Sequence, residues 1–428
     1  MKGRGAPVFV RLRARSLACA LALVFAAPVP VGAVESAIIV SPAASAAAEM
    51  AYGIGVDGTT VAIGAPGEND VAGAAYIVDC STLPCGAPLR IAPTELVADD
   101  AFGTALGISG NTLVVSAAGA VPGAAYVFVS DGVGWSQQAK LTASGLSAGE
   151  RFGQAVSLSG DRVAIGAGRV GVNGPGAVYV FVRNGTVWTE EAKLTPSDGE
   201  AFDAFGTSVV LDVDTILVGA PMNAASASTY ANGAVYAFVR GAGGWTEQAK
   251  LTAAGANGDL FGYSVALAGD RAIIGAPYAA NAQGQAYFFV RSGPTWSQQA
   301  VLTTATGAAG DEFGWSVALG DDSVFVGAPF VGQANGVACG ASYVFDATTL
   351  GEAGGTTIEA PVADELAGWA VAASGPRWVT SAPGHLVGDV AHAGAAYWFD
   401  PTITIFHAGF DAPGACIAPE NVSPRIAR

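Results

Sequence analysis

Hydrophobic and polar residues alternate over short segments of this chain, and no segment shows the period of an amphipathic helix. Residues 156–158 and 163–165 are examples in which small or polar residues alternate with apolar or β-branched ones. Tight-turn dipeptides such as Asp57-Gly58 and Gly160-Asp161 separate these segments, and they accept positive φ and match the twist of a hairpin. The pattern therefore predicts short antiparallel strands and an all-β fold.

Four signatures recur with a period of about 52 residues, which indicates a solenoid or a propeller. The first is an aromatic-glycine pair, and Gly-Ala-Pro or a variant of it follows fourteen residues after the aromatic. The third is Gly-x-x-Tyr, and the fourth is a tryptophan five residues before a lysine. In the first copy the spacing between the first two signatures is two residues shorter. The copies begin at Tyr52, Phe102, Phe152, Phe205, Phe261, Phe313 and, in degenerate form, Ala367.

Each repeat holds four strand-like segments, and one four-stranded sheet of this size cannot bury both of its faces. Seven sheets stacked around an axis form a seven-bladed β-propeller. Residues 37–40 precede Tyr52 as the fourth strand of each repeat precedes the next aromatic. We expect this N-terminal strand to complete the last blade of a propeller over residues 34–400, followed by a strand or tail over 401–428.

Residues 1–33 have the features of a secretory signal peptide. Basic residues end at Arg15, an apolar run covers residues 17–27, and small residues stand at the positions that precede cleavage. The run is too short to span a bilayer. We therefore expect an exported protein, found outside the cell, in a periplasm or at the cell surface.

Four cysteines remain after the leader, an even number in a compartment that permits disulfides. Cys80 and Cys85 enclose a short loop that a disulfide would close, and Cys339 with Cys416 would tie the C-terminal tail to the body. The alternative is four unpaired thiols.

The repeated signatures resemble the FG-GAP repeat of the integrin α-chain β-propeller, and the resemblance extends from Tyr52 to about residue 399. It implies a secreted or surface-displayed platform whose ligands bind the face that carries the 2–3 and 4–1 loops. In that family several blades hold calcium between strands one and two, in a D-x-D-x-D-G-x-x-D cage. Here a two-residue turn takes that place in every copy, so no cofactor is assigned, and calcium binding of the family type is in doubt.

A carboxylate stands two residues before the aromatic position in six of the seven repeats. In a propeller these acids would ring one mouth of the axial channel and would attract a metal ion or a basic ligand. Alternatively, each acid would bond to backbone amides of its own turn. The six residues are Asp100, Glu150, Asp203, Asp259, Asp311 and Glu365.

The 2–3 loops vary in length while the strands keep their spacing, and variable loops on a rigid scaffold are typical of a recognition surface. We expect ligand contacts in the loops 222–232, 330–339 and 384–393. The candidate residues are Asn223, Ser226, Ser228, Tyr230, Asn232, Phe330, Gln333, Asn335, His385 and His392.

Two further patterns have simpler explanations. The recurrent Trp135, Trp188 and Trp245 keep a fixed phase beside the fourth strand, which favours packing between blades over a sugar-binding stripe. Ser147 matches the G-x-S-x-G motif but lies in a 4–1 loop, without the strand-turn-helix context that a nucleophile needs. No catalytic residue is assigned.

The chain has 35 acidic and 19 basic residues, and five of the basic ones lie in the leader. Without the leader, 35 acidic residues stand against 14 basic ones. This negative charge disfavours nucleic-acid binding. We expect a monomeric, non-enzymatic module that binds a protein or a polysaccharide. The alternatives are an extracellular carbohydrate-active hydrolase or lyase that uses the propeller channel, and a purely structural envelope protein.

Overall fold

A computed structural model of the chain describes the repeat region and parts of its connections. The described residues are 37–42, 48–120, 122–146, 150–168, 174–223, 232–253, 258–305, 307–332, 338–356, 364–387, 390 and 392–400. Within them, no helix has the length and hydrophobicity needed to cross a membrane.

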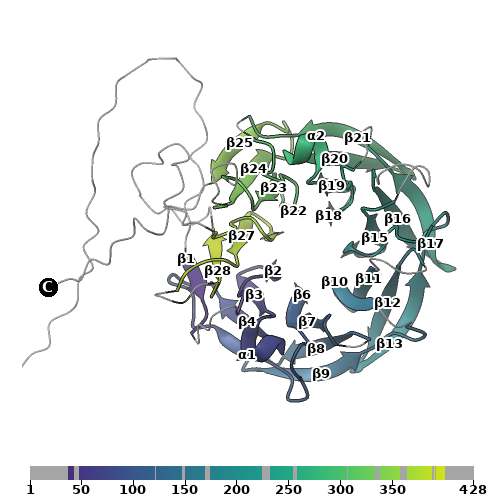
Figure 1. Ribbon diagram of the computed structural model, residues 1–428. Coiled ribbons are helices and arrows are strands. Elements are labelled where there is room, and N and C mark those ends of the chain that lie inside the picture. The colour runs from purple at the N-terminus through teal and green to yellow at the C-terminus, as the bar shows by residue number, and fades with distance from the viewer. Residues whose placement is uncertain are drawn as a thin grey trace, which may run out of the picture. The chain divides into compact units, whose positions relative to one another are not determined.

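Seven sheets of four antiparallel strands stand in a ring, with the first strand of each labelled blade nearest the axis and the fourth at the rim (Figure 1). The seven-bladed propeller expected from the repeat is therefore confirmed. Blade 1 comprises β2 (Ile54–Asp57), β3 (Thr60–Ala65), β4 (Ala74–Asp79) and β5 (Leu89–Ile91). Blade 2 comprises β6 (Phe102–Ser109), β7 (Thr112–Ala117), β8 (Ala124–Ser130) and β9 (Trp135–Leu141).

The next three blades repeat this order. Blade 3 comprises β10 (Arg151–Ser159), β11 (Arg162–Gly168), β12 (Ala177–Asn184) and β13 (Val187–Leu194). Blade 4 comprises β14 (Ser208–Asp212), β15 (Thr215–Ala220), β16 (Ala234–Gly241) and β17 (Gly244–Leu251). Blade 5 comprises β18 (Ser264–Ala268), β19 (Arg271–Ala276), β20 (Gln285–Ser292) and β21 (Thr295–Leu302).

The last two blades complete the ring, and short helices lie in two of the connections. Blade 6 comprises β22 (Ser316–Leu319), β23 (Ser323–Ala328), β24 (Ala341–Asp346) and β25 (Glu352–Thr356). Blade 7 comprises β26 (Val371–Ser374), β27 (Arg377–Ala382), β28 (Ala395–Phe399) and the N-terminal β1 (Ala37–Val40). The helices are α1 (Glu68–Val71) and α2 (Ala279–Ala282), in the 2–3 connections of blades 1 and 5.

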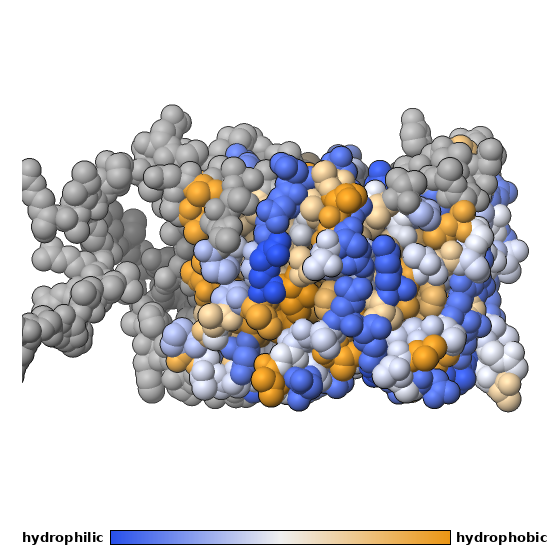
Figure 2. All heavy atoms as spheres, turned by 90° about the horizontal axis from the view of Figure 1, so that it is seen from below, coloured by the Kyte–Doolittle hydropathy of each residue, from blue (hydrophilic) through white to orange (hydrophobic). Residues whose placement is uncertain are grey.

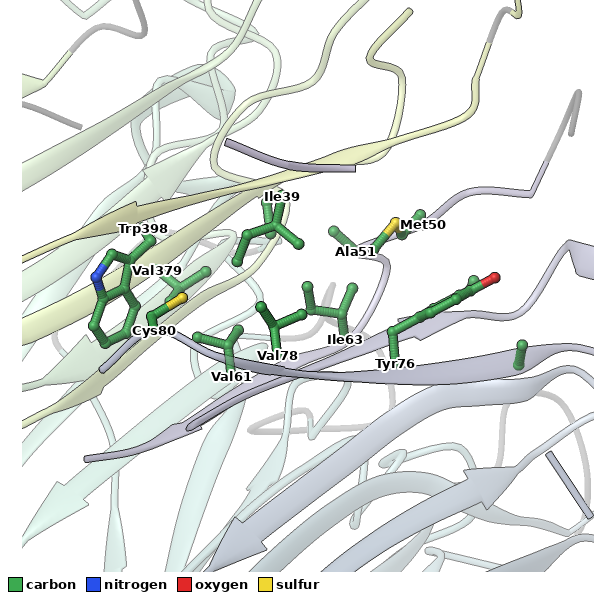
Figure 3. Close-up of a cluster of buried hydrophobic side chains, with 13 residues drawn as sticks. Ile39, Met50, Ala51, Val61, Ile63, Tyr76, Val78, Cys80, Val379 and Trp398 are labelled. Carbon is green, nitrogen blue, oxygen red and sulfur yellow. The ribbon is translucent and has the colours of Figure 1, made fainter. Parts of the chain in front are cut away.

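The N-terminal strand closes the ring, as the sequence predicts. β1 pairs antiparallel with β28, with Ala37 opposite Trp398 and Val40 opposite Ala395. Ile39 is buried in a cluster that joins blade 7 to blade 1, and Figure 3 shows it beside Val379 and Met50. The two ends of the repeat region therefore share one sheet and one hydrophobic cluster.

In five of the aromatic-glycine pairs the aromatic is buried against two rings of its own blade. Phe205 is fully buried and meets Tyr236 and Phe238 edge-on, with ring centroids 5.5 and 6.0 Å apart. Corresponding pairs recur in four further blades, at Phe102, Phe152, Phe261 and Phe313. This edge-to-face geometry is the preferred one for aromatic pairs, so the repeated aromatic is a packing element.

The glycines of the repeat allow backbone to meet backbone between blades. A Cβ on Gly219 would lie 2.0 Å from the carbonyl oxygen of Gly262 in the next blade. Gly233 has φ +85°, and its backbone forms a parallel bridge with Phe261. Only glycine combines this close approach with a left-handed backbone at low cost.

The first copy of the repeat is offset by two residues from the prediction. The Ala51 amide donates to the Gly64 carbonyl, as Gly206 does to Gly219 in blade 4. Met50 and Ala51 therefore occupy the position of the aromatic-glycine pair, which the sequence pattern assigns to Tyr52 and Gly53. The fourteen-residue spacing from Met50 to Gly64 is the regular one, which explains why the first copy looked shorter.

The recurrent tryptophans join the fourth strands of neighbouring blades. The indole Nε1 of Trp188 donates to Gln138 at 3.0 Å, and that of Trp245 donates to Glu191 at 3.1 Å. Trp135 is half-buried against the cluster of blades 1 and 2. In the side view of Figure 2, hydrophilic side chains form bands between smaller hydrophobic patches. The tryptophans thus pack blades together, as the sequence pattern favours.

One of the two expected disulfides lies within the described residues. Cys80 and Cys85 are bonded and close the short loop after β4. Cys339 is buried, and its expected partner Cys416 lies outside the described residues.

Candidate functional site

One side chain from each blade stands at the start of the innermost strand, two residues after the packing aromatic or its equivalent. We call these seven residues the mouth ring. Five of them line one hollow, and the remaining two continue the circle through ring contacts described below. The mouth ring consists of Tyr52, Thr104, Gln154, Thr207, Tyr263, Trp315 and Trp369.

Four neighbouring members form what we call the aromatic arc: Tyr263, Trp315, Trp369 and Tyr52. Their successive ring centroids are 4.7, 4.9 and 5.3 Å apart. Successive rings are inclined by 46°, 48° and 50°, close to the one-seventh turn that relates neighbouring blades. The arc therefore follows the rotation of the propeller, and side chains that differ in type occupy equivalent positions.

Phe330 adds a fifth ring to the arc from the 2–3 connection of blade 6. It meets Trp315 edge-on with centroids 5.4 Å apart and Trp369 at 6.5 Å. Phe330 was expected to contact a ligand because it lies in a variable loop, and in the structure it lies against the arc. All three rings remain partly exposed.

The other half of the mouth is a hollow of about 590 Å³. Tyr52 and Tyr263, the two end rings of the arc, line it together with Thr104, Gln154 and Thr207. Residues of a 4–1 loop and of the 118–122 segment of a 2–3 connection also line it. The hollow thus lies on the face that carries the 2–3 and 4–1 loops.

Gln154 and Arg151 are polar side chains that line the hollow. Gln154 Oε1 is buried and has no hydrogen-bond partner among the described residues. Arg151 is exposed at the rim, and its guanidinium is close enough to lower the pKa of Tyr52, against the larger effects of burial and of Glu49, which raise it. The lining of the hollow therefore includes an acceptor without a partner among the described residues and a cationic donor.

A half-buried carboxyl group lies beside the arc. Burial raises the pKa of Glu312 to about 7, opposed in part by a hydrogen bond from Tyr278. Burial also raises the pKa of Tyr263 well above its usual range, and the nearby charge of Glu312 adds to this effect. At neutral pH both tyrosines that line the hollow are uncharged phenols, able to donate and to accept hydrogen bonds.

The acids that precede the packing aromatics turn toward their own loops in three blades. Asp100 accepts a hydrogen bond from the Val97 amide at 2.9 Å, and Asp311 accepts one from the Ala308 amide at 2.7 Å. Asp203 accepts from the Glu200 amide at 2.8 Å. These contacts match the turn-bonding interpretation of the three acids.

The other three acids of this set have different surroundings. Asp259 is buried, Glu150 is partly exposed at the hollow, and Glu365 is buried beside His385. In the part of the chain that the structure describes, no group of three or more His, Cys, Asp or Glu side chains is arranged to hold a metal ion. A metal site at this ring therefore stays a prediction without geometric support.

Two of the loop candidates in blade 4 have structural contacts. The Asn223 side-chain amide donates to Asp203 Oδ2 at 2.9 Å, and Asn223 is buried. The backbone carbonyl of Asn232 accepts from Phe261. Ser147 lies outside the described residues. Five loop candidates also lie outside them: Ser226, Ser228, Tyr230, Gln333 and Asn335.

The two candidate histidines lie in the last 2–3 connection. His385 Nδ1 is 2.5 Å from Glu365 Oε1, and both atoms contact the hydroxyl of Tyr397. His392 has φ 53°, and its carbonyl accepts from the Glu49 amide. His385 therefore belongs to a cluster under the loop, and the structure does not bring the two imidazoles together in a described contact.

The mouth ring is absent from the residues predicted from the sequence, although the sequence contains a signal for it. The residue after each aromatic-glycine pair is Tyr263, Trp315 and Trp369 in three successive blades, whereas Thr104 and Thr207 are found elsewhere. The two-residue offset of the first copy hid Tyr52, because it was assigned to the packing position.

A comparison with known families supports the repeat assignment. The family model of the FG-GAP repeat matches residues 89–128, 135–181, 188–238, 245–289 and 296–345. The first match begins in β5, the fourth strand of blade 1, and ends in β8, the third strand of blade 2. No curated protein matches the chain.

Proposed function

We propose that this chain, which belongs to the FG-GAP repeat family, is an exported, non-enzymatic module that binds a protein or glycan ligand at the mouth of its propeller. The observation that carries the proposal is the concave mouth, where the aromatic arc adjoins a hollow of about 590 Å³. Ligand sites are typically concave and combine apolar rings with a few directed polar groups.

The chemistry of the mouth favours binding over catalysis. The titratable side chains that line the hollow are Tyr52, Tyr263, Glu150 and Arg151. The phenols are neutral because burial raises the pKa of both. A general base at the operating pH would need a carboxylate or imidazole whose pKa lies near that pH. Glu312 has such a pKa, but it is not among the residues that line the hollow.

Export is supported by the disulfide within the described residues. The bond between Cys80 and Cys85 is of the kind that persists in oxidising compartments. Together with the leader-like residues 1–33, it favours a site of action outside the cytosol. The variable loops around the mouth would then meet the ligand from the same face.

Binding by the mature chain to glycan arrays and to protein arrays tests this proposal. We expect saturable binding to one class, with no new reducing ends or unsaturated products after prolonged incubation. Two variants locate the surface: Trp369→Ala in the arc, and Trp378→Phe, which keeps an aromatic at a buried position away from it. Trp369→Ala should weaken binding and Trp378→Phe should not. Absence of binding to both arrays, or the release of products, would overturn the proposal.

The 222–232 loop gives an independent test of the same face. Replacing it by a short Gly-Ser turn should weaken binding if the 2–3 loops contribute contacts. Asn223 should be retained in this variant, because its side chain bonds to Asp203 beneath the loop. Unchanged binding by the variant would remove this loop from the binding surface.

A further inference from the structure

The residues that line the hollow at the mouth favour one class of ligand, whereas the proposed function allows a protein or a glycan. Its walls combine two aromatic rings with uncharged polar side chains: Tyr52 and Tyr263 at the ends of the arc, and Thr104, Gln154 and Thr207 between them. Each end tyrosine contacts one indole of the arc, at 5.3 Å for Tyr52 and 4.7 Å for Tyr263. The end rings thus bound the polar half of the mouth.

The buried acceptor is the most specific feature of this wall. Gln154 Oε1 has no hydrogen-bond partner among the described residues, and a buried polar atom without a partner destabilises the fold. A turn of the Gln154 side chain toward the hollow that it lines would let a ligand donate a hydrogen bond to this oxygen and remove that destabilisation. The hydroxyls of Thr104 and Thr207 donate to the carbonyls of Ala101 and Ala204, so they present acceptor lone pairs to a ligand. The guanidinium of Arg151 can donate to ligand oxygens.

The charge of the mouth disfavours anionic ligands. The charged residues that line this hollow are Glu150 and Arg151, which offset one another. A second hollow of about 360 Å³ shares Tyr52, Ala101 and Thr104 with the first and adds the carboxylate of Glu49. The whole chain also carries a formal net charge of -16. A ligand that is neutral and rich in hydroxyl groups therefore fits the site better than a phosphate or a uronic acid.

We propose that the hollow binds a terminal residue of a neutral oligosaccharide, and this inference rests on the proposed function. A pyranose ring has apolar C–H faces that pack on aromatic rings and a rim of hydroxyls that both donate and accept. That combination of apolar faces and hydroxyls matches the rings and polar side chains of the hollow, whose volume is within the roughly 300–1,000 Å³ of ligand pockets. The second hollow, which shares Tyr52 and Thr104, gives the next sugar residue a path toward blade 1.

Calorimetric and thermal-shift titrations with simple sugars test the inference. The probes are the methyl glycosides of glucose, galactose, mannose, xylose and N-acetylglucosamine, with galacturonic acid as the anionic comparison. We expect at least one neutral glycoside to bind saturably and to raise Tm, because a ligand that binds only the folded state stabilises it. Galacturonic acid should bind more weakly than galactose.

Three variants of the full mature chain connect that binding to the hollow. Tyr263→Ala removes an end ring and Gln154→Leu removes the buried acceptor, and each should weaken binding by about tenfold or more. Trp296→Ala is the matched control, because Trp296 lies on β21, a fourth strand, and does not line the hollow. Should Tyr263→Ala fail to fold, Tyr263→Phe and Gln154→Leu carry the test. The phenylalanine variant should keep most of the affinity if stacking dominates.

The outcomes separate this inference from the proposed function. If a protein ligand binds the mature chain and no neutral glycoside does, the inference is wrong and the proposed function stands. If neither binds, both are wrong. Binding of a glycoside that is equal in wild type, Tyr263→Ala and Gln154→Leu would place the sugar elsewhere and overturn the inference.

Discussion

One side chain per blade determines what the channel mouth presents, because the surrounding backbone repeats from blade to blade. Trp315 and Trp369 occupy the same position as Thr104 and Gln154, two residues after the packing position. Binding chemistry can therefore change by substitution at the mouth ring, without disturbing the Phe and Gly residues that pack the blades. The aromatic arc and the polar hollow are two halves of one ring.

Glu312 provides a prediction at this scale. Burial raises the pKa of its carboxyl group from 4.5 to about 7, so the folded state holds the proton more tightly than the unfolded chain. Between those pH values the free energy of unfolding should fall as pH rises, because the folded state must lose its extra proton. Glu312→Gln removes this titration. We expect it to raise Tm relative to wild type at pH 8 and to change Tm little at pH 4.

The control for this experiment is Glu352→Gln, which alters an exposed glutamate. Its Tm difference from wild type should be small and should depend little on pH. Thermal unfolding of the three proteins across pH 4 to 8 is the measurement. A Glu312→Gln difference that does not grow with pH would contradict the raised pKa.

Residue types alone did not decide between the two interpretations of the repeated acids. Asp100 and Asp311 lie in loops whose backbone amides point at them, and a carboxylate satisfies those amides without any metal. A sequence records that an acid recurs, but the direction of its side chain depends on the conformation of the turn. The structure supplies that direction for three of the six acids.

At the scale of elements, the contribution of the closing strand β1 to the free energy of unfolding is the most easily measured. Ile39 is 3% exposed in the cluster between blades 7 and 1, whereas its neighbour Ile38 is 49% exposed. Ile39→Ala should lower the free energy of unfolding by roughly 2–5 kcal/mol, because it leaves a cavity in a packed core. Ile38→Ala, the same substitution on the opposite face of the same strand, should have a much smaller effect.

Urea denaturation of the two variants and the wild type measures this difference. Equal destabilisation by Ile39→Ala and Ile38→Ala would mean that β1 does not lock the ring through this cluster. Figure 3 shows why we expect the asymmetry, since Ile39 points toward Val78 and Ile63 of the first blade.

The elements themselves were largely predictable from the sequence, because strand pattern, turn dipeptides and period agreed in every copy. The N-terminal strand was predicted over residues 37–40 and is found there. The first blade was misaligned because Met50 replaces the aromatic at the packing position, and Tyr52 two residues later resembles it. Met50 is fully buried, so an aliphatic side chain fills the site that a phenylalanine fills elsewhere.

For the whole molecule, closure of the ring of blades brings together residues that are far apart in the chain. Tyr52 and Trp369 are separated by most of the repeat region, yet their rings are 5.3 Å apart. Periodicity predicts that such positions are equivalent, but the type and direction of each side chain decide which of them line a common hollow. For that reason the propeller could be predicted from the sequence and its mouth could not.

The central claim is that the ligand binds at the mouth ring, and tryptophan emission tests it directly. The mature chain would be titrated with the ligand that the arrays identify, as wild type, as the Trp315→Phe/Trp369→Phe double variant and as Trp245→Phe. We predict that the emission change on binding disappears in the double variant and persists in Trp245→Phe, whose indole lies on a fourth strand at the rim. An emission change that persists undiminished in the double variant would contradict the account.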